Sequence, residues 1–425
     1  MTVDPLDLTP TPSEAARRAY QASLLVGRTE ASVRDRAIQA LADEIESQQE
    51  NILEANTLDL EASRDMAVPN LVLEWLKLTP ERLQTTVQIL RRLAQLTDPL
   101  RRVMNAAYQV ESAQTYCQLI PLGAIALIYE AFPELGAIAA GMCLKTGNSL
   151  ILKGSSEASH SNLAMAEVLQ SALGRTDLPP DCLQHVPVDR GDSLRELVGQ
   201  DRYLSLAIPY GRPSLIQSTL QHATVPVLPS AMGNCYLYWS VSGDWELVRS
   251  MVADSHKSQP DPVNAIEKVL IHRDLNPVSV AMLLKALREK GFEIRGDAAL
   301  VGEFPELALA ETGEWRQAYL TRTVAFKRVE SLQEAIAWVD EYSSGHADCA
   351  VTESYWESCQ FTLGVNSAST YINASPRFIR NPKQGRSILL GMSNQKGHHR
   401  GFIGLESLTA VKHIIQGYEP NSPQH

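Results

Sequence analysis

The strongest constraint on the fold is an alternation of short apolar strands and helices that begins near residue 120. Ala124–Ile128 is a continuous apolar stretch of strand length, and a helix of small residues is predicted over Gly136–Lys145, stopped by Gly147 and Asn148. Leu150–Leu152 is the next strand. Strands that are apolar at every position and separated by helices are typical of parallel sheets covered on both faces. We therefore expect an α/β fold.

The alternation continues along the chain and predicts two α/β units, joined near Pro226 to Gly233. Residues before the first strand predict helices instead. Thr79 is expected to cap one of them, with Pro80 and Glu81 in its first turn. The further predicted elements are helices over Ser161–Leu173, Val278–Lys290 and Leu332–Tyr342, and strands over Leu183–Val186, Leu204–Ile208, Val269–Ile271 and Val324–Val329.

The net charge and the spacing of the cysteines indicate which binding partners and which cellular compartment to expect. The formal net charge of -11 disfavours nucleic acids and anionic membranes. No apolar run reaches the ~20 residues of a membrane helix, and the acidic start, Met1–Pro12, is unlike a secretory signal. The six cysteines include no C-x-x-C pair, which favours reduced thiols in the cytoplasm, and no zinc-type spacing predicts a metal site.

Five phrases of the sequence resemble those of the γ-glutamyl phosphate reductases. They follow that family's order between about residue 20 and residue 418. One such phrase would be weak, but five in order are a specific signal. The phrases are Leu78–Leu83, Tyr129–Pro133, Leu144–Asn148, Tyr371–Phe378, and the stretch from Gln395 to Glu406.

The resemblance implies an aldehyde-dehydrogenase-like fold with two parallel-sheet α/β domains and a small oligomerisation element. The cofactor-binding, Rossmann-like domain with its helical N-terminus is expected at residues 1–106 and 121–226. The catalytic-type domain is expected at 227–370, and the oligomerisation element at 107–120 and 397–425. By the same resemblance, we expect a homo-oligomer.

The reaction implied by the resemblance is the NADPH-dependent reduction of L-glutamyl 5-phosphate to glutamate 5-semialdehyde and phosphate, a step of proline synthesis. A cysteine thiolate attacks the acyl phosphate, phosphate leaves, and hydride from NADPH reduces the thioester. NADP(H) is therefore the expected cofactor, and a thiol is required.

The position of the family's nucleophile is occupied by Val263 in this chain. Pro260, Asn264 and Glu267 match the flanking residues of the family's segment and fix the register. Valine has neither a lone pair nor a dissociable proton, so it cannot form the thioester. By the same resemblance, Asn264, next to it, is the second candidate residue of the catalytic site.

Other positions that touch substrate or cofactor in the family have also changed type. Phe132 and Glu134 replace an Arg and an Asn, and Phe cannot act as the planar fork that holds a carboxylate or phosphate. Arg212 and Ser214 stand in the glycine-rich phrase, where backbone would approach the cofactor phosphates. Ala318 replaces a ribose-binding glutamate.

Some binding positions persist. Lys153, Gly154, Glu157 and Gly211 match cofactor-binding positions. A basic residue such as Lys153 can meet a ribose 2′-phosphate, the mark of NADP, although a solvated lysine at a strand end is the alternative. Arg377 is the candidate substrate-binding residue, with a structural salt bridge as the other interpretation.

Several other residues could in principle substitute for the missing cysteine or its partners. Cys235 and Cys143 are more typical of buried packing residues than of nucleophiles. Ser255 and Ser258 have no evident base and resemble loop or cap residues. The pair 398–399 consists of histidines, for which a structural or interface role is favoured over catalysis.

Two classes of function follow. The first is a degenerate, non-catalytic paralogue of the reductase, which keeps the shell and the oligomer interface and binds a partner, an active homologue or a metabolite. The second is a functioning glutamate-5-semialdehyde dehydrogenase with an altered active site. A weaker third hypothesis is an enzyme that uses the inherited cleft without a protein nucleophile.

Overall fold

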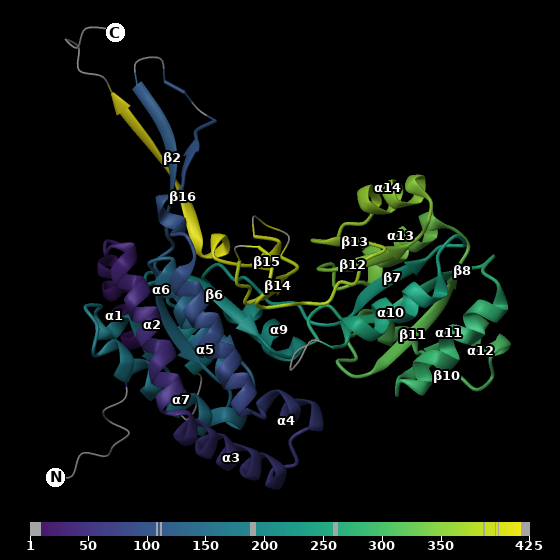
Figure 1. Cartoon of the computed structure of the whole chain (residues 1–425), viewed down its shortest axis with the longest axis horizontal. Helices are drawn as coiled ribbons and strands as arrows, with labels where there is room; N and C mark the ends of the chain where they lie inside the picture. The colour runs from purple at the N-terminus through teal and green to yellow at the C-terminus, as the bar shows by residue number, and fades with distance from the viewer. Residues whose placement is uncertain are drawn as a thin grey trace. The chain divides into compact units, whose positions relative to one another are not determined.

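The computed structural model describes residues 10–107, 109–110, 113–187, 193–257, 262–385, 387–395, 397 and 399–417. The chain forms two compact units (Figure 1). Unit 1 comprises Met1–Leu228, Asn381–Leu390 and Ile403–His425, and unit 2 comprises Pro229–Arg380 and Gly391–Phe402. Residues 397–425 were expected to belong to the oligomerisation element. The structure divides them, with residues up to Phe402 in unit 2 and those from Ile403 in unit 1.

Unit 1 begins with five helices, as the sequence of its first hundred residues predicts. Thr79 caps the fifth, because its side chain accepts a hydrogen bond from the Arg82 N–H at 3.3 Å. This predicted helix start is confirmed. The helices are α1 (Pro12–Val26), α2 (Ala31–Ser47), α3 (Gln49–Asp65), α4 (Asn70–Leu76) and α5 (Pro80–Gln95).

A four-stranded parallel sheet forms the centre of unit 1, in the order β5-β4-β3-β6. Every residue of β3 is buried, which explains its unbroken apolar sequence. The predicted helix after β3 starts three residues early, because Pro133 fits its first turn. The elements are β3 (Ala124–Tyr129), α6 (Pro133–Lys145), β4 (Ser149–Lys153), α7 (Ser159–Leu173), β5 (Leu183–His185), α8 (Ser193–Val198), β6 (Leu204–Tyr210) and α9 (Pro213–His222).

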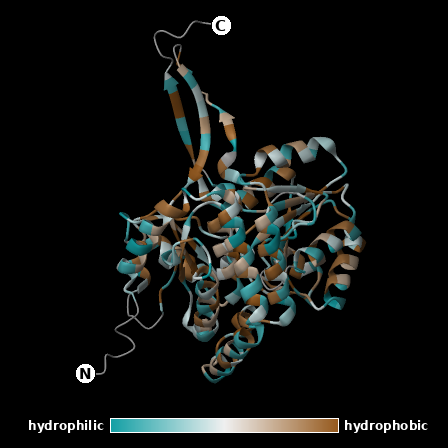
Figure 2. Cartoon of the chain, turned by 60° about the vertical axis from the view of Figure 1, so that its left-hand side comes forward, coloured by the Kyte–Doolittle hydropathy of each residue, from teal (hydrophilic) through white to brown (hydrophobic). Residues whose placement is uncertain are grey.

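A second, antiparallel sheet extends away from the body of unit 1 (Figure 1). It consists of β1 (Val103–Asn105), β2 (Ala113–Pro121) and β16 (Thr409–Gly417), with β2 in the middle. Hydrophobic and hydrophilic residues are mixed along its strands (Figure 2). Strands so far apart in sequence pair directly, with Cys117 of β2 opposite His413 of β16.

Unit 2 is built on a seven-stranded sheet in the order β10-β9-β11-β8-β7-β12-β13, with parallel pairing throughout. Both predicted parallel sheets are thus confirmed. The strands are β7 (Cys235–Trp239), β8 (Ile266–His272), β9 (Glu293–Gly296), β10 (Ala308–Leu309), β11 (Thr323–Val329), β12 (Asp348–Val351) and β13 (Thr370–Ile372). A two-stranded sheet, β14 (Gly391–Ser393) with β15 (Gly401–Ile403), completes the strands.

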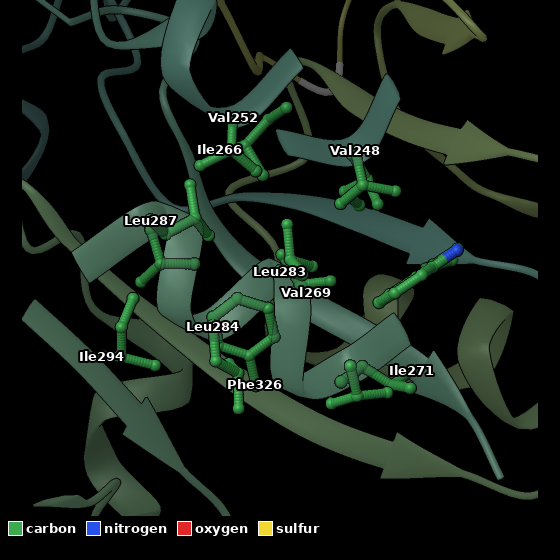
Figure 3. Packing of buried hydrophobic residues seen from close by; sticks show 14 of the residues in the cluster. Val248, Val252, Ile266, Val269, Ile271, Leu283, Leu284, Leu287, Ile294 and Phe326 are labelled. Atoms are coloured by element: carbon green, nitrogen blue, oxygen red, sulfur yellow. The ribbon is translucent and has the colours of Figure 1, made fainter. Parts of the chain in front are cut away.

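Helices cover both faces of the unit 2 sheet. The helices are α10 (Trp245–Ser255), α11 (Pro277–Glu289), α12 (Ala298–Glu303), α13 (Leu332–Tyr342) and α14 (Tyr355–Gly364). On one face, side chains of α10 and α11 pack on the strands (Figure 3). On the other face, α13 and α14 contribute to a separate core. No helix in the described residues is long and apolar enough to span a membrane.

Candidate functional site

The sheet of unit 1 has the topology that creates a ligand crevice in open α/β folds. From β3 the chain moves to β4 and β5 on one side, and then returns to place β6 on the other side of β3. Ligands in such folds bind outside the carboxyl ends of the strands at this change of direction. The residues that follow β3, β4 and β6 therefore define the first candidate site.

An aromatic cluster fills one side of these strand ends. Phe132 stacks on Trp75 with ring centroids 4.9 Å apart, and meets Tyr210 edge-on at 5.4 Å. All three side chains are buried. The position where the family places an arginine is thus part of a packed core and presents no group to an anion.

Glu134, in the first turn of α6, is held by Arg82 of α5 in an ion pair. Arg82 also donates to the Trp75 carbonyl oxygen at 3.1 Å. Glu134 is buried, and its Oε2 has no hydrogen-bond partner within the described part of the chain. Negative charge therefore stands where the family has a neutral asparagine, compensated from within the protein.

Glu130, directly after β3, binds the side chain and backbone of Arg212. The Arg212 N–H donates to Glu130 Oε2 at 2.8 Å, and Arg212 Nε donates to Oε1 at 2.9 Å. The guanidinium also lies 3.4 Å from Glu157. The hydrogen bonds to Glu130 raise the pKa of Arg212, and this effect is larger than the lowering caused by burial. The predicted cofactor residue Glu157 thus lies against the Arg212 guanidinium.

Lys153 is the last residue of β4 and is buried, and Gly154 follows it in close contact with Asn162. Lys153 Nζ lies 3.5 Å from the Gly154 carbonyl oxygen. A Cβ on Gly154 would lie 2.0 Å from Asn162 Nδ2, so this glycine has a packing role. Burial, with a contribution from the nearby Lys153 charge, lowers the pKa of His185 to about 4.

Val263 lies in unit 2, in the segment that leads into β8. Its side chain is buried, and its carbonyl oxygen accepts hydrogen bonds from the Gly233 N–H at 3.0 Å and from His346 Nε2 at 2.7 Å. Because a carbonyl can only accept, the proton of the neutral imidazole is placed on Nε2. Position 263 therefore carries a buried aliphatic side chain that has no nucleophilic atom.

The residues after Val263 form a buried polar framework. Asn264 Nδ2 donates to the Pro376 carbonyl oxygen at 2.8 Å, while Oδ1 has no partner in the described residues. The Glu267 carboxylate accepts the backbone N–H groups of Asn234, Tyr319 and Leu320 at 2.7–2.8 Å. Burial raises the pKa of Glu267, against these donors and the adjacent Lys268. Glu267, in β8, thereby connects its own strand to the residues that precede β7 and β11.

Cys235 is close to the Val263 segment but has the wrong electrostatics for a nucleophile. Its Sγ lies 3.3 Å from His346 Nε2, the nitrogen whose proton is donated to Val263. Burial raises the pKa of the Cys235 thiol well above its usual value and lowers that of His346 to about 4. Neither a thiolate nor an available base is therefore present at neutral pH.

The other proposed substitutes have structural roles where they are described. Burial raises the pKa of Cys143, which lines a small closed cavity together with Cys182. Ser255 Oγ donates to the Val252 carbonyl oxygen and accepts from the Ile266 N–H. Ser258 and His398 lie outside the described residues.

Arg377 takes part in a partly exposed ion pair. Its Nη1 lies 3.6 Å from Asp254 Oδ1, and Ser375 Oγ donates to the same carboxylate at 2.8 Å. Arg377 directly follows Pro376, the residue bonded by Asn264. The structure therefore brings Val263, Asn264 and the Arg377 segment together in unit 2, and the four cofactor candidates together in unit 1.

Comparison with known proteins decides the family. The chain is 55% identical over 385 residues to "Gamma-glutamyl phosphate reductase 2" of Synechocystis sp., covering 90% of this chain and 92% of that one. It is 37% identical over 402 residues to the reductase of Gloeobacter violaceus, covering 95% and 96%. The chain belongs to the γ-glutamyl phosphate reductase family. Residues 11–208 also match the aldehyde dehydrogenase family.

Solved structures agree with this membership. The crystal structure of γ-glutamyl phosphate reductase from Thermotoga maritima matches with a TM-score of 0.89 at 28% identity, covering 98% of this chain and all of that one. A propionaldehyde dehydrogenase from Clostridium phytofermentans has a TM-score of 0.68 at 12% identity, covering 96% and 98%, which speaks for the fold alone. The expected aldehyde-dehydrogenase-like α/β fold is confirmed.

The sequence did not predict several residues that contact the candidate site residues of this γ-glutamyl phosphate reductase family member, because they are brought there only by the tertiary structure. Trp75 and Arg82 come from the N-terminal helices, and His346 from the loop before β12. Lys268 is another, since burial lowers its pKa to about 8 and its Nζ lies 3.6 Å from the centre of the Tyr319 ring. The signal for Lys268 in the sequence is a pair of adjacent charged residues, Glu267 and Lys268, within a strand whose other residues up to Ile271 are apolar.

Proposed function

We propose that this member of the γ-glutamyl phosphate reductase family is non-catalytic. The observation that carries the proposal is Val263 at the nucleophile position, buried and without a reactive atom. The family reaction needs a thiolate to displace phosphate and hold the acyl group. Loss of a covalent nucleophile costs several orders of magnitude in rate.

The surroundings of Val263 give no replacement thiolate. Cys235 lies beside this segment, and its thiol is buried, has a raised pKa, and faces an imidazole nitrogen that carries a proton. A working glutamate-5-semialdehyde dehydrogenase with an altered site is the alternative, and it requires the Cys235 thiol to become exposed and ionised during turnover.

Weak binding of NADP(H) is part of the same proposal. A nicotinamide cofactor is the expectation for the family, but the residues at the strand ends of unit 1 fit it poorly. Arg212 replaces a glycine and is paired with Glu130 and Glu157. Lys153 remains in unit 1 as a basic residue for a 2′-phosphate. In unit 2, Ala318 offers no carboxylate at the position matched to a ribose-binding glutamate.

We further propose a cytoplasmic homo-oligomer that can include an active homologue. The sheet of β1, β2 and β16 exposes apolar side chains in an element too thin to form a core of its own. These side chains include Val103, Val411 and Ile415, each more than half exposed. Light scattering on the purified chain tests this, and a monomer at micromolar concentration would contradict it.

Complementation of a proline auxotroph tests the absence of catalysis in a cell. A strain without its own γ-glutamyl phosphate reductase should stay auxotrophic when it expresses this chain to a level verified by immunoblotting. The Gloeobacter violaceus relative, expressed in parallel, is the control. Growth without proline supported by this chain would overturn the proposal.

A further inference from the structure

The turn between β6 and α9 is the place in unit 1 where a dinucleotide fold holds phosphate. It follows the strand at which the sheet changes direction, and it leads into a helix N-terminus, where backbone N–H groups and the helix dipole favour an anion. Gly211 and Arg212 form this turn, with Arg212 as the residue that precedes the first turn of α9.

An anion from the protein itself occupies this turn. The Glu130 carboxylate accepts the Arg212 backbone N–H at 2.8 Å, which is a bond that a phosphate oxygen makes in nucleotide-binding turns. The Arg212 guanidinium then holds the same carboxylate through Nε at 2.9 Å and through Nη2. Backbone and side chain of one residue thus bind one carboxylate together.

The fit between the two segments is tight. Gly211 has a φ of 153°, and a Cβ there would lie 2.7 Å from the Cβ of Glu130 and 2.8 Å from its Oε2. The glycine is therefore needed for the close approach of Glu130. A phosphate could reach the N–H of Arg212 only after Glu130 had moved away.

The charges at the turn also oppose a phosphate. Glu130 and Glu157 both face Arg212, so two carboxylates surround one guanidinium. Arg212 is about one-third exposed and the two carboxylates less so. An incoming anion would have to compete with two charge-assisted hydrogen bonds from the guanidinium to Glu130 Oε1, a type of bond that is stronger than one between neutral groups.

We propose that Arg212 is a specificity-determining residue that closes the unit 1 crevice to dinucleotides by fixing the Glu130 carboxylate at the start of α9. This inference rests on the proposed function, because it gives the cause of weak cofactor binding. It concerns binding alone, so it can fail while the absence of catalysis stands.

The test is direct NADPH binding to the full chain by isothermal titration calorimetry. Variants Arg212→Gly and Arg212→Ala, each combined with Glu130→Gln, remove the guanidinium together with the carboxylate charge that it holds at the turn. The second variant keeps a Cβ in case the glycine impairs folding. Arg175→Gly is the matched control, because Arg175 is also a loop arginine of unit 1 paired with a glutamate, Glu44. Thermal unfolding verifies that each variant is folded.

Both Arg212 variants are expected to bind NADPH at least tenfold more tightly than the wild type and Arg175→Gly, which should bind alike. No gain in either Arg212 variant, or an equal gain in Arg175→Gly, would overturn the inference. Tight NADPH binding by the wild type would also overturn it, whereas turnover by the wild type would overturn the proposed function instead.

Discussion

The two regions that hold the candidate site residues are built in different ways. Around Val263 in unit 2, hydrogen bonds form a polar framework: Glu267 binds three backbone N–H groups and Asn264 bonds Pro376. At the strand ends of unit 1, side chains fill the candidate site, with Phe132 packed on Trp75 and Arg212 bound to Glu130. The first region holds an unreactive side chain within a hydrogen-bonded frame, and the second is closed by packing and an ion pair.

This difference between the two regions indicates which interactions stabilise each unit. In unit 2, the hydrogen bonds of Glu267 and Asn264 stabilise the fold whether or not position 263 carries a reactive group. In unit 1, Phe132 and Arg212 themselves contribute packing and an ion pair. Restoring a family residue should therefore be harmless at position 263 and costly at position 132.

The largest effect is expected for Glu267→Ala. Three buried backbone N–H groups lose their acceptor, at about 1–3 kcal/mol each, so unit 2 should lose about 5 kcal/mol of unfolding free energy. Urea unfolding followed by tryptophan fluorescence measures this, since five of the six tryptophans lie in unit 2. A loss below about 1 kcal/mol would show that this framework is dispensable.

Phe132→Arg should be nearly as damaging to unit 1. The change removes a buried ring from its contacts with Trp75 and Tyr210, and places a charge there. We expect a loss of about 4 kcal/mol, with Phe132→Leu as the size-matched control losing about 1 kcal/mol. If the arginine variant is as stable as the leucine variant, the cluster is not a packed core.

The pH dependence of unit 2 should be weaker in His346→Gln. Burial lowers the pKa of His346 to about 4, so between pH 4 and 6.5 the unfolded chain binds one more proton than the folded one. This contribution therefore lowers stability as pH falls, by up to about 1.4 kcal/mol per pH unit. Glutamine can still donate to the Val263 carbonyl.

The measurement is urea unfolding at pH 5 and pH 6.5 for both proteins. His256 acts in the same direction as His346, with a pKa lowered to about 4 by burial. Asp348 acts in the opposite direction, because burial raises its pKa to about 6. Both groups are common to the two proteins, so an unchanged pH slope in His346→Gln would refute the assignment.

The smallest effect is expected for Arg377→Ala. The ion pair with Asp254 is 3.6 Å long and partly exposed, and pairs of this kind contribute about 0–1 kcal/mol. The unfolding free energy should therefore change by less than about 1 kcal/mol. A larger loss would mean that Arg377 has a structural role beyond this pair.

The sequence predicted the parallel sheets and the start of α5, because both depend on local patterns. The assignment of Val263 to the nucleophile position rests on flanking motifs and stays a prediction. The sequence did not predict that Phe132 would stack on Trp75, or that Arg212 would bind Glu130, from which it is 82 residues distant. Such contacts depend on how strands and helices are brought together, which no local pattern encodes.

The reactivity of Cys235 was open for the same reason. A cysteine beside the nucleophile segment is a reasonable substitute until its surroundings are known. The structure buries the thiol and places it against a histidine whose proton is donated to Val263. Burial and tautomer, both properties of tertiary structure, decide against a thiolate.

The most direct test of a non-catalytic reductase is the reverse reaction with purified wild type and Val263→Cys, supplied with glutamate 5-semialdehyde, phosphate and NADP. We expect no phosphate-dependent NADPH formation by either protein, because a thiol at position 263 leaves Phe132 and Arg212 in place at the strand ends of unit 1. Turnover by the wild type would contradict the central claim. Turnover by Val263→Cys alone would leave the wild type inactive but would contradict the account of unit 1.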